Sequence, residues 1–221
     1  MPPRDNGATS GGMRRWSILL AALAISAAPA PAPQPRPLVL AFGDSLTAGY
    51  ALDRGLGFAP QLQASLRRHG IAATVVDGGV SGDTSQAGRA RLGWTLDGLP
   101  RKPDLIIVEL GANDMLRALD PKLTKANLDA ILTELERRKI RTVLAGMRAA
   151  PNLDPAYIAA FDAIYRDLSA KHRATLYPFF LDGVAGQAGM VQQDAMHPTF
   201  AGVKTIVTRI LPTIKRALGK N

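Results

Sequence analysis

The chain has 221 residues, of which 47% are hydrophobic and 20% are charged, and its formal net charge at pH 7 is +9. This length and balance predict one globular domain with its own core, and they exclude a repeat protein or a disordered chain. Cysteine is absent from the sequence, which excludes disulfides, thiolate nucleophiles and cysteine metal sites. The basic excess lies on helical runs such as 67–68 and 137–139 without interleaved aromatic residues, so we expect no nucleic-acid partner.

The first 36 residues are expected to precede the folded domain. Met13-Arg14-Arg15 is followed by an apolar stretch over 16–28, which is the order of a secretory signal peptide. That stretch is shorter than the roughly 20 apolar residues of a membrane-spanning helix. Residues 1–30 are therefore interpreted as an N-terminal extension with a signal peptide, which predicts a periplasmic or secreted protein. The proline-rich residues 31–36 predict an extended linker, and the domain is expected to occupy 37–221.

From Pro37 onward, apolar strand-like runs alternate with amphipathic helical stripes, which is typical of a parallel sheet covered on both faces. The third run is apolar except for Glu109, as expected of a central strand buried on both sides. The last stripe contains Pro212, which should break or kink its helix. The pattern predicts a three-layer α/β/α domain with five parallel strands. These strands are expected at residues 37–42, 73–77, 105–110, 142–147 and 175–179.

A serine follows the first predicted strand, in the sequence Gly43-Asp44-Ser45-Leu46. Open α/β sheets bind ligands outside the carboxyl ends of their strands, so a hydroxyl at this turn is well placed to react. The same residues are also compatible with a turn that only caps a helix. The other parts that a nucleophilic serine needs must come from elsewhere in the chain.

Two further turns should reach the same edge of the sheet, at 78–84 and 111–114. Gly82 and Asn113 lie in them and could supply N–H donors where an oxyanion develops during acyl transfer. Taken singly, Gly82 could equally be a turn glycine and Asn113 a helix cap.

A candidate base occurs late in the chain, in Asp194-Ala195-Met196-His197-Pro198. A nucleophilic serine needs a base, and the base needs an acceptor on its other nitrogen. Asp194 and His197 are three residues apart and can meet locally, and the proline keeps His197 out of a helix interior. The two remaining histidines, His69 and His172, are expected at solvent-facing helix ends.

Four blocks in this order resemble the SGNH hydrolase superfamily, also called GDSL esterases. Within it, the chain looks most similar to the secreted bacterial branch of thioesterase, lysophospholipase and arylesterase enzymes. One departure is Ala112, where this branch often has glycine. The four blocks are Gly43-Asp44-Ser45-Leu46, Gly82, Gly111-Ala112-Asn113-Asp114 and Asp194-x-x-His197-Pro198.

The resemblance implies a fold, an activity and a set of roles. The fold is the flavodoxin-like strand order 2-1-3-4-5. The activity is hydrolysis of aryl, lysophospholipid or thioesters through an acyl-enzyme. Ser45 would be the nucleophile, His197 the base and Asp194 its orienting partner. The oxyanion would be held by the N–H groups of Ser45 and Gly82 and by the Asn113 amide.

Substrate contacts are expected near the same turns. The segment 115–120 after Asn113 is interpreted as a mobile wall of the acyl pocket. The mechanism needs no cofactor or metal, and the nearby aspartates Asp44, Asp83 and Asp114 are expected to accept hydrogen bonds from local backbone N–H groups. The expected partner is a small-molecule ester, with a lipid at a membrane surface as one option, and the chain is expected to be monomeric. The pocket candidates are Leu46, Phe58, Met115, Leu116 and Leu119.

Three alternatives remain open on the sequence alone. Ser81 is a rival nucleophile because it also precedes a glycine in one of the turns. A sugar O-deacetylase would use the same triad on acetyl groups. A flavodoxin-like module that binds phosphate or flavin without catalysis would share the fold, but it would leave Asp194 and His197 without a role.

Overall fold

The computed structural model describes residues 1–3 and 36–220 of the chain. The expected signal peptide and nearly all of the expected linker lie outside these residues. Residues 36–220 belong to one compact unit, which contains every helix and strand described below. None of the described helices combines the length and the apolar character that crossing a membrane requires.

Five parallel strands form the sheet, and their spatial order is β2-β1-β3-β4-β5. This confirms the predicted α/β class and the order 2-1-3-4-5. All five strands point the same way, so their carboxyl ends share one edge, where the turns after β1, β2 and β3 meet. The strands are β1 Leu38–Gly43, β2 Thr74–Gly79, β3 Leu105–Glu109, β4 Arg141–Ala145 and β5 Thr175–Tyr177.

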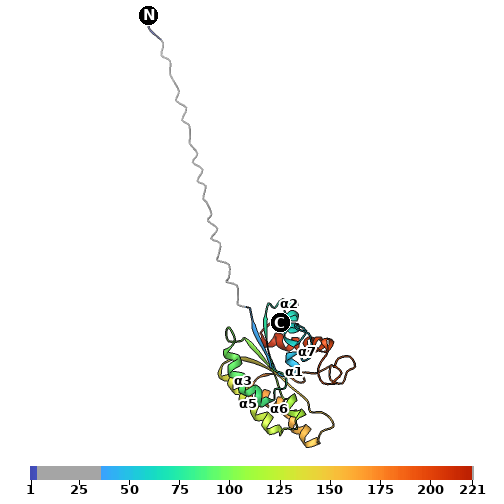
Figure 1. Ribbon diagram of the computed structural model, residues 1–221. Coiled ribbons are helices and arrows are strands. Elements are labelled where there is room, and N and C mark those ends of the chain that lie inside the picture. Colours follow the sequence, from blue (N-terminus) through green and yellow to red (C-terminus); the bar gives the residue numbers. More distant parts are fainter. Residues whose placement is uncertain (4–35, 221) are drawn as a thin grey trace. The chain divides into compact units, whose positions relative to one another are not determined.

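Helices cover both faces of this sheet, which confirms the three-layer arrangement. One layer contains α2 and α7, which pack on each other, and the other contains α3, α5 and α6 (Figure 1). Two short helices, α1 and α4, begin immediately after β1 and β3. The helices are α1 Ser45–Ala48, α2 Phe58–Arg68, α3 Ser85–Asp97, α4 Ala112–Leu116, α5 Pro121–Arg137, α6 Pro155–His172 and α7 Phe200–Ala217.

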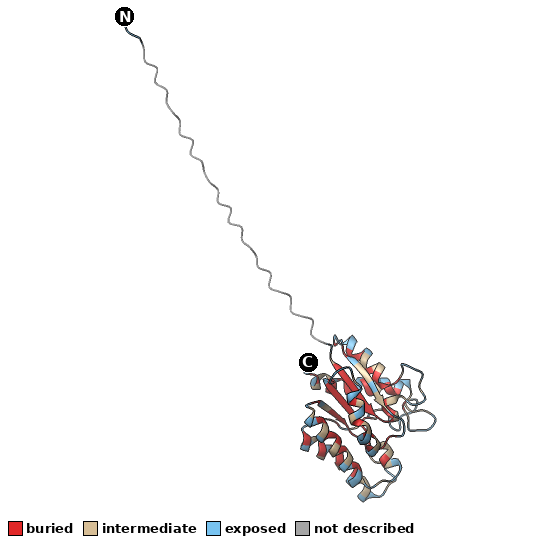
Figure 2. Cartoon of the chain, turned by 60° about the vertical axis from the view of Figure 1, so that its left-hand side comes forward, coloured by how far each residue is buried: buried red, intermediate tan, exposed pale blue. Residues whose placement is uncertain are grey.

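The sheet centre is the most buried part of the domain. Every residue of β1 and of β3 is buried (Figure 2). In contrast, β2 at the edge of the sheet is only partly covered. Burial of apolar side chains contributes roughly 25 cal/mol per Å² of area removed from water, so these two central strands anchor the fold. They also hold the turns that follow them on a rigid base.

The last helix begins just after the Asp194–His197 segment. The Thr199 hydroxyl accepts a hydrogen bond from the N–H of Gly202 and caps α7. The helix continues through Pro212 to Ala217, so of the two expected effects, a break or a kink, the break does not occur. Pro212 lies on the exposed side, where water can solvate the carbonyl that loses its N–H partner.

Candidate active site

Ser45 is the first residue of α1, at the carboxyl edge of the sheet. Asp44 is the N-cap, and its Oδ1 accepts a hydrogen bond of 3.0 Å from the N–H of Leu46. Gly43 leaves no room for a side chain, because a Cβ there would lie 2.6 Å from the carbonyl oxygen of Glu109. The backbone of β1 and β3 therefore packs tightly beneath the serine and fixes its position.

His197 links the serine to an aspartate. Its Nε2 lies 2.9 Å from Ser45 Oγ, and its Nδ1 lies 2.6 Å from Asp194 Oδ2. The other oxygen of Asp194 accepts the backbone N–H groups of Met196 and His197, each at 3.0 Å. These two backbone hydrogen bonds, with the contact to the imidazole, lower the pKa of Asp194 to about 2. An anion beside Nδ1 favours the tautomer whose Nε2 can accept the serine proton.

Three residues that line the same cavity carry N–H groups with unused hydrogens. Within the part of the chain that the structure describes, the backbone N–H groups of Ser45 and Gly82 donate no hydrogen bond. Gly82 adopts φ +87°, a conformation that side-chain-bearing residues rarely take, and this turn leaves its N–H unused. Asn113 Nδ2 donates one hydrogen to Asp44 Oδ2 at 3.0 Å and keeps a second. All three residues line one cavity.

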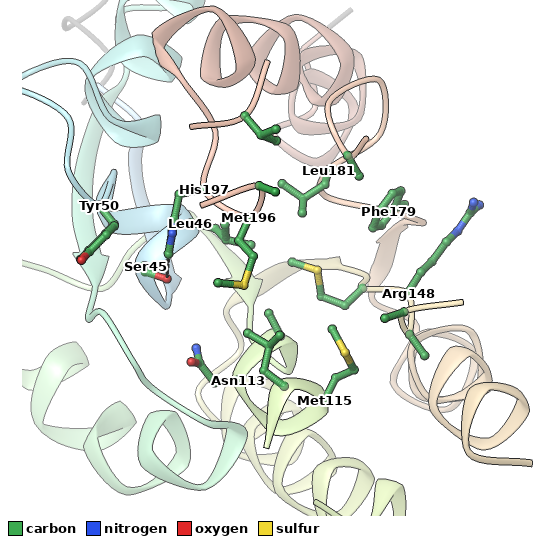
Figure 3. A pocket seen from close by; sticks show the side chains of 18 of the residues that line it. Ser45, Leu46, Tyr50, Asn113, Met115, Arg148, Phe179, Leu181, Met196 and His197 are labelled. Atoms are coloured by element: carbon green, nitrogen blue, oxygen red, sulfur yellow. Dashed lines mark hydrogen bonds between the residues drawn. The ribbon is translucent and has the colours of Figure 1, made fainter. Parts of the chain in front are cut away.

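This cavity has a volume of about 660 Å³ and a mostly apolar wall. Figure 3 shows Ser45, His197 and Asn113 at one end and Phe179 with Arg148 at the other. The Arg148 guanidinium lies 5.0 Å from the centroid of the Phe179 ring, a distance typical of a cation–π contact. The apolar wall includes Leu46, Met115, Leu116, Met147, Phe179, Leu181, Val191 and Met196.

Two of the expected pocket residues are placed elsewhere. Phe58 is 1% exposed and packs edge-on against Phe180 in the core, with ring centroids 5.1 Å apart. Leu119 is half-buried but is not part of the cavity wall. Phe58 belongs to the buried stripe of α2, which the sequence pattern alone could not distinguish from a pocket position. The rival Ser81 lines the cavity, but its hydroxyl contacts no histidine among the described residues.

Two residues that sequence reasoning missed hold the histidine in place. The Tyr50 ring packs against the His197 ring, with centroids 4.4 Å apart and an angle of 35° between the ring planes. Gln192 Nε2 donates to the carbonyls of Tyr50 and Pro198 at 2.9 and 3.0 Å, and the Gln192 N–H donates to the His197 carbonyl. Gln192 thus ties the segment after α1 to the segment that carries the base. Neither residue belongs to a sequence motif that would mark it.

The three aspartates near the turns behave differently from one another. Asp44 accepts a local N–H as expected, but Asp83 forms an ion pair with Arg91 at 2.5 Å. Asp114 accepts the backbone N–H and the hydroxyl of Ser85, 29 residues away. The expectation of local backbone partners is therefore wrong for Asp83 and Asp114, which tie α3 to neighbouring segments instead.

The expectation for the other histidines holds for only one of them. His69 is exposed at the end of α2. The His172 side chain is only 5% exposed, and its two nitrogens contact Asp129 Oδ1 at 2.6 Å and Glu136 Oε2 at 3.0 Å. The solvent-facing placement of His172 is wrong, because two acidic residues of α5 lie opposite the end of α6 and give the ring polar partners.

The lowered pKa of Asp194 generates a testable prediction. The folded state prefers the ionised carboxylate, so this interaction stabilises the protein above the ordinary carboxyl pKa of about 4 and is lost as the pH falls towards 2. Urea unfolding of the wild type and Asp194→Asn should show a stability difference at pH 5–7 that shrinks below pH 4. A difference that stays constant from pH 7 to pH 2 would contradict the assigned contacts.

Comparison with known proteins identifies the family of this chain. The GDSL-like Lipase/Acylhydrolase family model matches residues 41–204. Esterase TesA of Pseudomonas aeruginosa is 37% identical over 180 residues, which cover 81% of this chain and 89% of that protein. The thioesterase 1/protease 1/lysophospholipase L1 of Escherichia coli is 34% identical over 72% of this chain and 74% of its own.

A solved structure of a similar sequence shares the fold. The crystal structure of AlinE4, an SGNH-hydrolase family esterase, has 49% sequence identity and a TM-score of 0.71, and the match covers 82% of this chain and 96% of AlinE4. The family match spans most of the chain and includes Ser45, Gly82, Asn113, Asp194 and His197. As the motif resemblance predicted, the chain belongs to the GDSL-like lipase/acylhydrolase family and is an ester hydrolase.

Proposed function

We propose that this enzyme hydrolyses carboxylic esters through an acyl-enzyme on Ser45, with His197 as the base and Asp194 as its orienting partner. The observation that carries this proposal is the 2.9 Å contact between Ser45 Oγ and His197 Nε2, with a carboxylate 2.6 Å from the other ring nitrogen. A serine hydroxyl is a weak nucleophile until a neighbouring base can take its proton. This arrangement supplies that base.

The reaction proceeds in two halves. Ser45 Oγ attacks the ester carbonyl carbon while its proton passes to His197 Nε2, and the imidazolium then gives that proton to the departing alcohol or thiol. In the second half, water loses a proton to His197 and attacks the acyl carbon. The acid leaves, and Ser45 recovers its proton. Asp194 stabilises the imidazolium in both halves and keeps its own negative charge.

The oxyanion of each tetrahedral intermediate is held by the N–H groups of Ser45 and Gly82 and by Nδ2 of Asn113. The unused backbone donors and the second Asn113 hydrogen support this role. Removal of one such donor typically lowers kcat by about 10²- to 10³-fold. These donors are therefore expected to contribute more to the rate than to the stability of the fold.

The apolar cavity favours esters with a hydrocarbon acyl or aryl group. Its volume of about 660 Å³ and its leucine and methionine wall suit a medium or long chain better than the acetyl group of a sugar. Relatives are named esterase, arylesterase and thioesterase/lysophospholipase, and we propose substrates of these classes for this chain. We also propose that the enzyme is exported and acts as a monomer. Because the chain belongs to a hydrolase family, we do not propose the alternative function of a non-catalytic flavodoxin-like binding module.

Replacement of the nucleophile provides the direct kinetic test. Ser45→Ala should lower hydrolysis of p-nitrophenyl butyrate to the rate without enzyme, because it removes the hydroxyl that forms the acyl-enzyme and Ser81 contacts no histidine among the described residues. Its far-UV circular dichroism should match that of the wild type. Ser65→Ala is the matched control, since Ser65 lies in α2 away from the cavity, and it should keep the wild-type rate. Activity that survives in Ser45→Ala would refute the proposal.

Chain-length preference can be tested with a pair of leucines. Leu116 lines the cavity and is 56% exposed, whereas Leu119, three residues later, is not in its wall. A panel of p-nitrophenyl esters from acetate to palmitate should show a preference for medium or long chains. Leu116→Ala should change that profile and Leu119→Ala should leave it unchanged. An acetate preference in the wild type would instead support the deacetylase alternative.

A further inference from the structure

A second acidic side chain lies beneath the Ser45 turn and takes no part in the mechanism above. Glu109 is the last residue of β3, and its Cα pairs with that of Gly43 in the β1–β3 register. The side chain is fully buried, and no ion pair of the described residues includes it. An isolated carboxylate in such a place is strongly disfavoured, so a buried carboxyl without a cation is normally neutral.

The two oxygens of the Glu109 carboxyl group differ in their hydrogen bonds. Oε2 accepts a hydrogen bond of 2.7 Å from the Thr47 hydroxyl. Oε1 is buried and has no donor among the described residues. A carboxylic acid would resolve this, because a protonated Oε1 becomes a donor. Asp44 directly follows Gly43, the register partner of Glu109, so its carboxylate is the nearby group that could accept this proton.

Asp44 in turn contacts both halves of the active site. Its Oδ1 holds the Leu46 N–H at the start of α1, and its Oδ2 accepts the Asn113 amide at 3.0 Å. A proton from Glu109 would therefore fix the carboxylate that orients Asn113.

The electrostatics of the pair agree with this geometry. Burial, followed by the neighbouring negative charge of Asp44, raises the pKa of Glu109 well above its ordinary value. Burial also raises the pKa of Asp44, to about 6, and hydrogen bonds from Leu46, Asn113 and Glu109 oppose that rise. Both directions agree with a Glu109 that binds a proton more tightly than Asp44 does. Other groups that face it are His197, the Tyr165 hydroxyl of α6, and Arg91 of α3, which donates to the Gly43 carbonyl.

We propose that Glu109 is a positioning residue that, as a neutral acid, donates a hydrogen bond to Asp44 and so holds the Asn113 amide towards the oxyanion. This proposal rests on the proposed role of Asn113 in the esterase reaction. Glu109 itself touches no substrate, since it does not line the cavity. Its influence on the rate passes through Asp44 and Asn113.

Two substitutions separate this role from simple packing. Glu109→Gln keeps both contacts, because its carbonyl can accept from Thr47 and its amide can donate to Asp44. Glu109→Leu fills a similar volume but leaves Asp44 without this donor. With p-nitrophenyl butyrate, Glu109→Leu should lower kcat by about 10-fold or more with little change in KM. Glu109→Gln should stay within about threefold of the wild type.

The pH profile gives a second readout. In Glu109→Leu, Asp44 loses the hydrogen-bond donor of Glu109, so the pKa of Asp44 should rise above about 6. The acid limb of the kcat/KM profile should then move to higher pH. The limb should return towards its wild-type position in Glu109→Gln. A purely structural defect would lower the rate at all pH values alike.

A double-mutant cycle tests the route through the amide. Glu109→Leu should have little further effect in an Asn113→Ala background, because the group that it positions is already absent. The proposal is overturned if Glu109→Leu keeps the wild-type rate, if Glu109→Gln loses as much as Glu109→Leu, or if the loss is equally large in the Asn113→Ala background.

One measurement is independent of catalysis and of the folding of the leucine variant. In full-length Ser45→Ala protein at pH 7, infrared difference spectra against Ser45→Ala/Glu109→Gln should show the C=O band of one protonated carboxylic acid. A band from an ionised carboxylate in its place would refute the neutral acid even if the enzyme is an esterase. If the protein had no esterase activity, this infrared band would be unchanged. A failure of the neutral-acid proposal can therefore be distinguished from a failure of the esterase proposal.

Discussion

The contact between Ser45 Oγ and His197 Nε2 joins residues 152 positions apart, and the site depends on it. The parallel sheet provides one end of this contact, since β1 ends at Gly43 and sets the serine at the carboxyl edge. The other end is provided by the turn before α7, which Asp194 organises through three hydrogen bonds. Gln192 and the Tyr50 ring then hold the two segments together.

Polar groups buried beneath the serine distinguish this sheet edge from an ordinary strand end. Asp44, Thr47 and Glu109 are all buried, although each is polar. Such groups destabilise a fold unless they are paired, so a connected set of them at a turn indicates a constraint other than packing. We infer that this constraint is the orientation of the donors that meet the oxyanion. Gly43 permits this set because it leaves space for the Glu109 carboxyl.

The sequence was sufficient to predict the class and the positions of the turns, because apolar runs and glycine-rich turns are local signals. The strand order 2-1-3-4-5 came from the motif resemblance and not from these patterns. Contacts between side chains from different elements were not predictable in this way. Phe58 fitted both a helix stripe and a pocket, and only its packing on Phe180 decides between them. The same is true of His172, Gln192 and Glu109. Each has a hydrogen-bond partner at least 36 positions away in the sequence, and no local pattern marks that contact.

The central claim is that Ser45 carries the acyl group during turnover. A serine-directed phosphonate, followed by proteolysis and mass spectrometry of the peptides, tests this most directly, because the label stays on the oxygen that attacks. We expect one label per chain, on Ser45, and no label in the Ser45→Ala variant. A label on Ser81, which lines the same cavity, would contradict the claim.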